Sequence, residues 1–227
     1  MTASLAAIRR RIIACERCPR LRAHCARVAR DKRAAYRDQP YWGRPVPGFG
    51  DRRARVLVLG LAPAAHGANR TGRVFTGDGS ADFLMRAMHG AGFASSATSR
   101  ARDDGLTLTD AYIAAVVRCA PPDNRPTPAE IANCRPHIEA ELRALANLRV
   151  IVALGKVAFD AYWRLAIGPG QQPRPRPRFA HGLVFRAAGV CSLVASYHPS
   201  RQNTNTGRLT PDMLAAVFEE ARRLAAA

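Results

Sequence analysis

Four short apolar runs rich in branched residues recur along the chain, and each leads into a segment that contains glycine, proline or asparagine. Continuous apolar runs of this length are typical of strands that are buried on both faces of a parallel sheet. The runs are residues 54–59, 111–117, 149–154 and 191–196. Segments with apolar residues at helical spacing separate them. This alternation predicts an α/β fold of three layers, α/β/α, with a central, mostly parallel four-stranded sheet.

The helical segments carry start signals of their own. Asp78 and Ser80 are candidate caps for a helix over residues 81–88. Thr127 and Glu130 form a capping box with proline at the first helical position, so a helix is expected from there through Cys134 to about residue 146. Further helices are expected within residues 3–35, from residue 156 to about 165 and from 211 to about 223.

The remaining segments complete the predicted organisation. Residues 168–178 are a basic, proline-rich tract that predicts an exposed, extended loop, and residues 179–190 predict a short β excursion. A length of 227 residues suits one α/β domain with a full core. We therefore expect a single domain over residues 1–227, with residues 1–53 forming N-terminal helices and a loop.

The loop from Gly60 to Ser80 connects the first predicted strand to the next helix and contains five glycines. Its glycine pattern fits neither a dinucleotide-binding fingerprint nor a P-loop, which argues against a nucleotide cofactor. Phe75 offers a flat ring, and the glycines allow close approach to the backbone. A flat, polar ligand that stacks on Phe75 is the better expectation.

Three loops follow strands and should meet at one edge of the sheet: residues 60–80, 118–127 and 197–208. They bring Asp78, Asn124 and His198 together as candidate catalytic residues. No second carboxylate clearly pairs with Asp78, so the two-carboxylate chemistry of ordinary glycosidases is not predicted. One carboxylate, one imidazole and one amide suit a reaction that develops a cation on a sugar and an anion on a leaving group. Simpler roles stay open: a helix cap for Asp78, and turn residues for His198 and Asn124.

Four cysteines form a candidate metal set: Cys15 and Cys18 in a C-x-x-C pair, then Cys119 and Cys134. Four thiolates suit zinc or an iron–sulfur cluster. A structural zinc site more often uses two close pairs, so the wider second pair favours a cluster. The alternative is a set of buried thiols, which is the expectation for the two other cysteines, Cys25 and Cys191.

The net charge of the chain indicates what kind of partner it binds. The formal net charge is +18, and only two lysines contribute, Lys32 and Lys156. A compositional habit explains arginine in place of lysine but not the excess of positive charge. A polyanionic partner is therefore expected, and a nucleic acid is the partner that such a charge favours. No apolar run is long enough for a membrane span and no secretory signal is evident, so a soluble, cytoplasmic protein is expected.

Three features together resemble the uracil-DNA glycosylase superfamily, and most closely its family 5, the type with a [4Fe–4S] cluster. They are the sequence GLAPAAHGANRTGRVFTGD at residues 60–78, the four cysteines, and YHPSRQNTNTGR at residues 197–208. The resemblance covers nearly the whole chain. It implies that Cys15, Cys18, Cys119 and Cys134 bind the cluster.

The resemblance also implies roles in the site. Phe75 would stack on an extruded base, Asp78 would act on the catalytic water, and Asn124 and His198 would contact the base. The segment 198–208 would probe the minor groove. The full set expected to bind substrate is Gly60, Ala62, Ala64, Phe75, Ala115, Ser200, Asn203 and Asn205.

Two departures from better-known uracil glycosylases are shared with family 5. This chain has only Ala62, Ala64 and Ala65 where those enzymes have a polar residue after the first strand, and Ala115 where they have a base-reading asparagine. A fixed asparagine rejects other bases because its amide is left unpaired. The resemblance to family 5 implies activity on uracil, hypoxanthine and xanthine, and the loss of this penalty at Ala115 agrees with that range.

The sequence thus predicts a monomeric, monofunctional DNA glycosylase that starts base excision repair. Neither lysine lies in the three loops, so a Schiff-base lyase step is not expected. Two alternatives remain: a non-catalytic nucleic-acid-binding module with a structural zinc, and a narrow-specificity family 4 uracil-DNA glycosylase.

Overall fold

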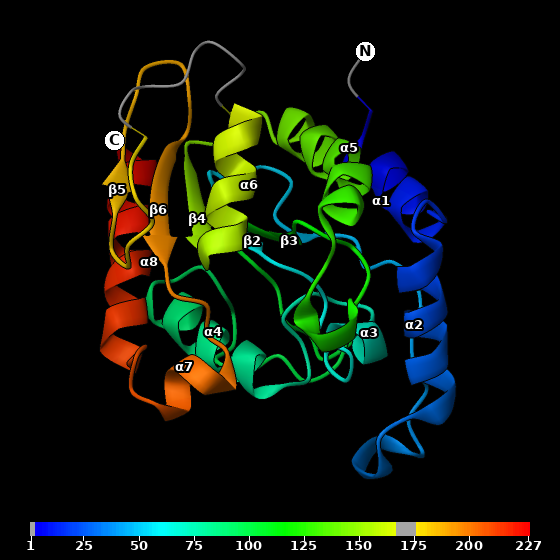
Figure 1. Ribbon diagram of the computed structural model, residues 1–227. Coiled ribbons are helices and arrows are strands. Elements are labelled where there is room, and N and C mark those ends of the chain that lie inside the picture. The colour runs from blue at the N-terminus through cyan, green and yellow to red at the C-terminus, as the bar shows by residue number, and fades with distance from the viewer. Residues whose placement is uncertain (1–2, 167–175) are drawn as a thin grey trace.

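A six-stranded sheet forms the centre of the protein, whose computed structural model describes residues 3–166 and 176–227 (Figure 1). The strands follow the order β1-β3-β2-β4-β6-β5 across the sheet. Their bounds are β1 Phe49–Gly50, β2 Val56–Gly60, β3 Ala111–Ala115, β4 Val150–Leu154, β5 Val184–Phe185 and β6 Ser192–Ser196.

The four predicted strands are β2, β3, β4 and β6, and all of their mutual pairings are parallel. The α/β class and the mostly parallel sheet are confirmed, but the sheet has six strands rather than four. The two additional strands, β1 and β5, pair antiparallel at the edges. Each has only two residues. Strand β5 lies within residues 179–190, where a short β excursion is predicted. Strand β1 lies in a segment expected to be a loop, because a strand this short produces no hydrophobic pattern.

Helices cover both faces of the sheet (Figure 1). Their bounds are α1 Leu5–Ile13, α2 Pro19–Asp31, α3 Ala68–Thr71, α4 Gly79–Gly90, α5 Pro128–Ala144, α6 Lys156–Ala166, α7 Arg201–Asn205 and α8 Pro211–Ala226. Two single turns of 3-10 helix, η1 Ala34–Tyr36 and η2 Pro122–Asn124, lie in the connections. The short helices α3 and α7 lie inside segments that the sequence analysis treats as loops.

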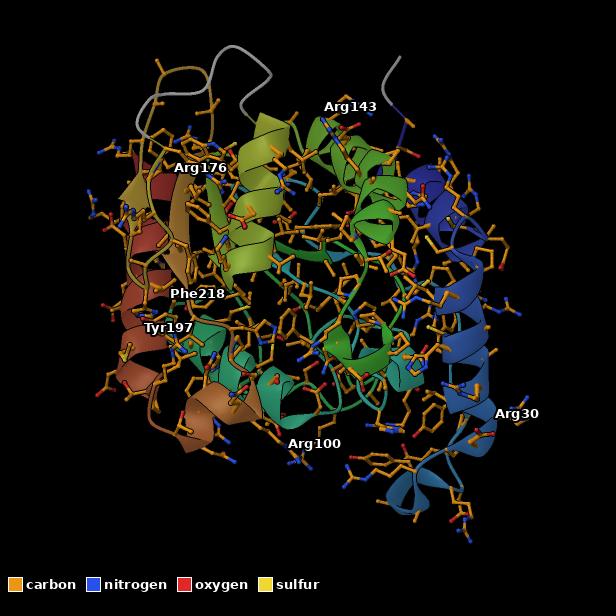
Figure 2. All side chains as sticks on the ribbon, in the orientation of Figure 1. Arg30, Arg100, Arg143, Arg176, Tyr197 and Phe218 are labelled. Carbon is orange, nitrogen blue, oxygen red and sulfur yellow. The ribbon has the colours of Figure 1, made fainter. Side chains whose placement is uncertain are left out.

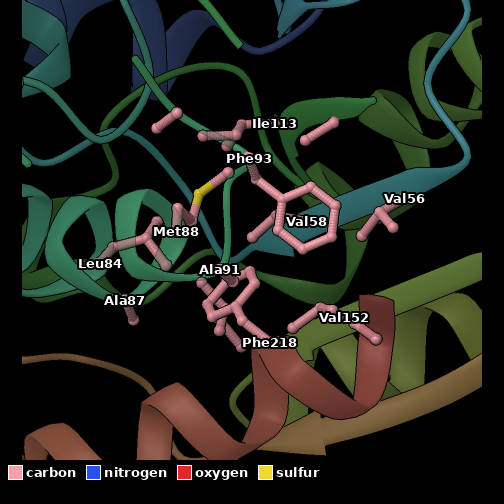
Figure 3. Close-up of a cluster of buried hydrophobic side chains, with 14 of the residues drawn as sticks. Val56, Val58, Leu84, Ala87, Met88, Ala91, Phe93, Ile113, Val152 and Phe218 are labelled. Carbon is pink, nitrogen blue, oxygen red and sulfur yellow. The ribbon is translucent and has the colours of Figure 1, made fainter. Parts of the chain in front are cut away.

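Alternate residues of each central strand point to opposite faces, which divides the core in two. Val56 and Val58 of β2 pack with Leu84 of α4 and Phe218 of α8 (Figure 3). Leu57 and Leu59 pack on the other face, in the cluster that holds apolar residues of α2, α5 and α6. Burial on both faces explains why the strands read as unbroken apolar runs.

The helix starts follow the predicted chemistry. Thr127 accepts a hydrogen bond from the Glu130 backbone and the Glu130 carboxylate accepts one from the Thr127 backbone, which is the reciprocal capping box. Asp78 caps α4 and Ser200 caps α7. The predicted ends of α8 and α5 differ from the observed ones by two or three residues, as is usual at frayed termini.

Most of the predicted proline-rich loop at residues 168–178 lies outside the described residues. Within the described part of the chain, no helix combines the length and apolar character that crossing a membrane requires. Arginines project from well-separated parts of the surface, as Arg30, Arg100 and Arg143 do in Figure 2.

Candidate active site

A cleft of about 660 Å³ opens at the carboxyl ends of the parallel strands, where the three predicted loops meet. This is the edge at which open α/β sheets usually bind ligands. Of the predicted site residues, eight line the cleft: Asp78, His198, Asn124, Ala62, Ala64, Phe75, Ala115 and Ser200. The sequence analysis missed Arg201 and Gln202, which also line it, although both lie in the 197–208 motif.

Asp78 lies at the junction of the long loop and α4. Its Oδ1 accepts a hydrogen bond of 2.9 Å from the Ala81 backbone, so the predicted cap is real. The cap uses only Oδ1, so a cap and a catalytic role are compatible. The second oxygen, Oδ2, lies close to Gly67, where an added Cβ would be 2.0 Å from it. Burial raises the pKa of Asp78, and hydrogen bonds from the Ala81 and Ser80 backbones partly oppose that rise.

His198 follows β6 and lies beside Phe75 in the lining of the cleft. The two rings have centroids 5.9 Å apart and planes tilted by 31°. Burial lowers the pKa of His198 to about 4, so its imidazole is neutral at physiological pH. A neutral imidazole can donate one hydrogen bond and accept another.

Phe75 holds an unusual backbone conformation, with φ of +46°. Its ring lies directly over Gly60, where an added Cβ would be 2.8 Å from the ring edge. Gly60 does not line the cleft; it provides the space that Phe75 occupies. The glycine at the end of β2 therefore sets the position of the aromatic face.

Asn124 lies at the exposed rim of the cleft, at the end of η2. It and Asp123 both have positive φ, +56° and +52°. Two consecutive non-glycine residues in this region mark a backbone held in a demanding conformation by its surroundings. The turn thus places Asn124 at the rim of the cleft.

Besides Gly60, two other predicted residues lie outside the cleft lining. Asn203 donates a hydrogen bond of 2.8 Å from Nδ2 to the His198 carbonyl, so it holds the His198 backbone rather than facing a ligand. Asn205 is exposed at the last position of α7. The sequence pattern could not separate them from Ser200, because all three follow the same strand.

The four predicted cysteines come together from three segments. Cys15 and Cys18 lie at the turn between α1 and α2, Cys119 follows β3, and Cys134 lies on α5. The pKa of Cys134 is raised, first by burial and further by its neighbours Cys18 and Cys15. Among the described residues, no three His, Cys, Asp or Glu side chains are placed to hold a single metal ion.

Cys119 also lies beside Cys25, and this contact and burial raise the pKa of the Cys119 thiol. Cys25 is fully buried and its Sγ lies 3.6 Å from the Ala120 carbonyl oxygen. Two buried nitrogen atoms in this region have no hydrogen-bond partner among the described residues: Arg118 Nε, next in sequence to Cys119, and His137 Nε2, one helical turn after Cys134.

Comparison with known proteins identifies the class. The model of the uracil DNA glycosylase superfamily matches residues 47–222, which include all three cleft loops. The fold and the cleft thus belong to a member of that superfamily.

Individual relatives narrow this assignment. A type-5 uracil-DNA glycosylase of Mycobacterium bovis is 53% identical over 94% of this chain and 79% of its own length. A type-5 uracil-DNA glycosylase of Thermus thermophilus is 51% identical over 94% of this chain and 95% of its own. A type-4 enzyme of Thermotoga maritima is 35% identical over only 52% of this chain. The chain belongs to the type-5 uracil-DNA glycosylases.

Proposed function

We propose that the chain is a monofunctional DNA glycosylase that removes uracil and other deaminated bases from DNA. The observation that carries the proposal is the placement of Asp78, Phe75 and His198 around one cleft. The cleft volume of about 660 Å³ lies in the usual range for small ligands, roughly 300–1,000 Å³. The target base must leave the helix to reach such a site, at a cost of a few kcal/mol.

The chemistry follows from the environment of each side chain. The extruded base stacks on Phe75, whose ring lies beside that of His198. Ionised Asp78 holds a water below the sugar C1′ and stabilises the positive charge that develops there. The bond from C1′ to the base nitrogen breaks, and its electron pair leaves with the base. Neutral His198 donates a hydrogen bond to the resulting anion, while Asp78 takes the proton of the attacking water.

Ala115 supports a wide substrate range. It is the last residue of β3 and lines the cleft, and it offers no polar group to a base edge. A pocket without a fixed amide does not leave that amide unpaired when hypoxanthine or xanthine replaces uracil. We therefore include these bases among the substrates.

We also propose that Cys15, Cys18, Cys119 and Cys134 bind a [4Fe–4S] cluster. Support comes from the donor set, from the electrostatic influence of Cys15 and Cys18 on Cys134, and from the unpaired buried donor of the adjacent Arg118. Binding of such a cluster would require these thiols to lose their protons, and the positive charge of its iron ions would offset the repulsion among the thiolates. Such a cluster would tie the N-terminal helices to the sheet and would take no part in bond cleavage.

The first test is base release from matched DNA duplexes that contain uracil or hypoxanthine, under single-turnover conditions. We expect alkali-labile abasic sites at both bases. Asp78→Ala should lower the rate at least about a hundredfold with DNA binding nearly intact. Release of uracil alone would favour the narrow specificity of the type-4 enzymes. Colourless, zinc-loaded protein that binds DNA without making abasic sites would favour the binding module.

A further inference from the structure

Arg70 lies within the loop of residues 60–80, and its side chain bonds to the backbone at both ends of residues 66–77, which thus form a closed ring. It belongs to α3 and is 8% exposed. Its Nε donates a hydrogen bond of 2.8 Å to the His66 carbonyl, and its Nη2 donates one of 2.7 Å to the Gly77 carbonyl. One planar guanidinium thus joins both sides of the segment that ends at Asp78.

The third side of the guanidinium is held by the N-terminal part of the chain. Arg70 Nη1 donates a hydrogen bond of 2.5 Å to Gln39 Oε1, and the guanidinium carbon lies 4.0 Å from the ring centroid of Tyr36. The backbone continues this contact, because Trp42 donates to the Arg70 carbonyl at 2.8 Å. Residues 36–42, which we call the arm, therefore pack against the loop from outside.

At the Gly77 end of the ring, the backbone conformation and the close packing leave little room for movement. Gly77 has φ of +79°, and a Cβ there would lie 2.4 Å from Arg70 Nη2. Its backbone N–H donates to the Ser99 carbonyl at 2.8 Å. Because Gly77 immediately precedes Asp78, the Arg70 contact sets the direction in which the chain enters the capping position.

The contact partners of Arg70 also indicate why arginine is needed. Within the described part of the chain these partners are two carbonyls and an amide oxygen, spread around the plane of the guanidinium. A lysine ammonium is a point donor and cannot reach the three directions at once. The surroundings thus require the planar shape of the guanidinium group and not only its positive charge.

We propose that Arg70, held by Gln39 and Tyr36 of the arm, is a positioning residue that sets the place of the Asp78 carboxylate for base release. The proposal rests on the function proposed above. A displacement of about 1 Å at a reacting group lowers rates about a hundredfold. Loss of the guanidinium should therefore lower the rate of base release while the fold and DNA affinity persist.

Chemical rescue distinguishes positioning from a merely structural role. Removal of the side chain leaves a space beside a surface hollow of about 390 Å³ that Tyr36, Gln39 and Gly77 line, so a free guanidinium ion can enter. We expect Arg70→Ala to release uracil about a hundredfold more slowly under single-turnover conditions. Guanidinium chloride, at concentrations far below those that denature proteins, should raise the rate of this variant at least about tenfold. Sodium chloride at the same concentration should not raise the rate. Arg70→Lys should be slow and should not be rescued.

Hydrogen exchange gives a second measurement that does not depend on activity. Amides of residues 66–81 should exchange faster in Arg70→Ala, and guanidinium should restore their protection. The control is Arg86→Ala, which removes an exposed arginine from α4 and should change neither measurement. If Arg70→Ala does not fold, Gln39→Ala removes one of the three contacts and should slow base release several-fold at unchanged DNA affinity.

The outcomes separate the two proposals. Wild-type protein that releases no base would refute the proposed function, and the exchange comparison would still decide whether Arg70 holds the loop. Wild-type activity together with an Arg70→Ala rate within threefold of it would overturn the positioning role. Slow release without guanidinium rescue, with exchange faster throughout the protein, would show that Arg70 only stabilises the fold.

Discussion

Replacement of Gly67 by alanine tests the placement of Asp78 with a single methyl group. Gly67 lies in the long loop, and its carbonyl accepts hydrogen bonds from the Arg70 and Thr71 backbones. A Cβ at this position would lie 2.0 Å from Asp78 Oδ2 and 2.9 Å from Asp78 Cγ. Both distances are shorter than contacts that real Cβ atoms make, so the carboxylate or the loop must move.

The size of the movement sets the expected effect. Contacts below 3.0 Å are essentially absent, so Oδ2 and the added Cβ must move apart by at least the difference from 2.0 Å, which is 1.0 Å. A misplacement of about 1 Å costs about a hundredfold in rate, or about 2.7 kcal/mol of activation free energy. The hydrogen bond from Ala81 to Oδ1 is the structural contact at risk, and the loss of a helix cap costs about 1 kcal/mol.

The assay is single-turnover release of uracil from duplex DNA, with the Kd for DNA and the unfolding transition measured on the same preparation. We expect a rate lowered about a hundredfold, a Kd within a few-fold of wild type and a modest loss of stability. Gly90→Ala is the matched control, because Gly90 lies in the last turn of α4 and its added Cβ meets no atom within 4 Å. A Gly67→Ala rate within threefold of wild type would refute the placement of the reacting oxygen.

Three further predictions concern the pH response, the substrate range and the cysteines. Because burial raises the pKa of Asp78, base release should rise with pH through a midpoint above the ordinary aspartate value, and Asp78→Asn should remove that rise; a midpoint at or below the ordinary value would contradict this. His198, with its pKa of about 4, should add no second limb near neutrality. Ala115→Asn should narrow release toward uracil, and an unchanged ratio of hypoxanthine to uracil release would count against the pocket argument. Cys119→Ser should lower both the yield of folded protein and the absorbance near 400 nm, whereas soluble, fully active variant protein would show that the metal proposal is wrong.

The same pKa direction carries a consequence for stability. Asp78 binds its proton more tightly in the folded protein than in the unfolded chain, because burial raises its folded-state pKa. The folded state therefore loses stability as the pH rises through that pKa, and regains it as the pH falls. Ionised Asp78 therefore lowers the stability of the fold at neutral pH, because a buried charge costs free energy. The proposed reaction requires that charge.

The fold was predictable because burial acts on whole strands. Val56–Gly60 is covered on both faces, so the chain must be apolar at every position, and that pattern is visible in the sequence. The helix starts at Asp78 and Thr127 were predictable for a local reason, since a cap bonds to a backbone only three residues away. Of the two-residue edge strands, β5 lies within the β excursion expected at residues 179–190, whereas β1 was not predicted, because backbone pairing alone holds it.

The candidate site was predictable in outline and not in detail. Parallel strands bring their following loops to one edge, so the meeting of Asp78, Asn124 and His198 follows from topology. Gly67 matters because it lies close to the carboxylate of Asp78, eleven positions later. No rule of sequence spacing predicts that proximity. The acceptors of Arg70 are mostly backbone carbonyls, and these are the same whatever the local sequence. The catalytic roles themselves remain predictions.

The short edge strands have a consequence for the behaviour of the protein in a crowded cell. A parallel sheet exposes unpaired N–H and C=O groups along its outer strands, and such edges recruit other chains into aggregates. Here Phe49–Gly50 lies along β3 and Val184–Phe185 along β6, each running in the opposite direction to its neighbour. Each adds too little length to act as a template for a further strand. The central sheet is thereby protected from self-association at both of its sides.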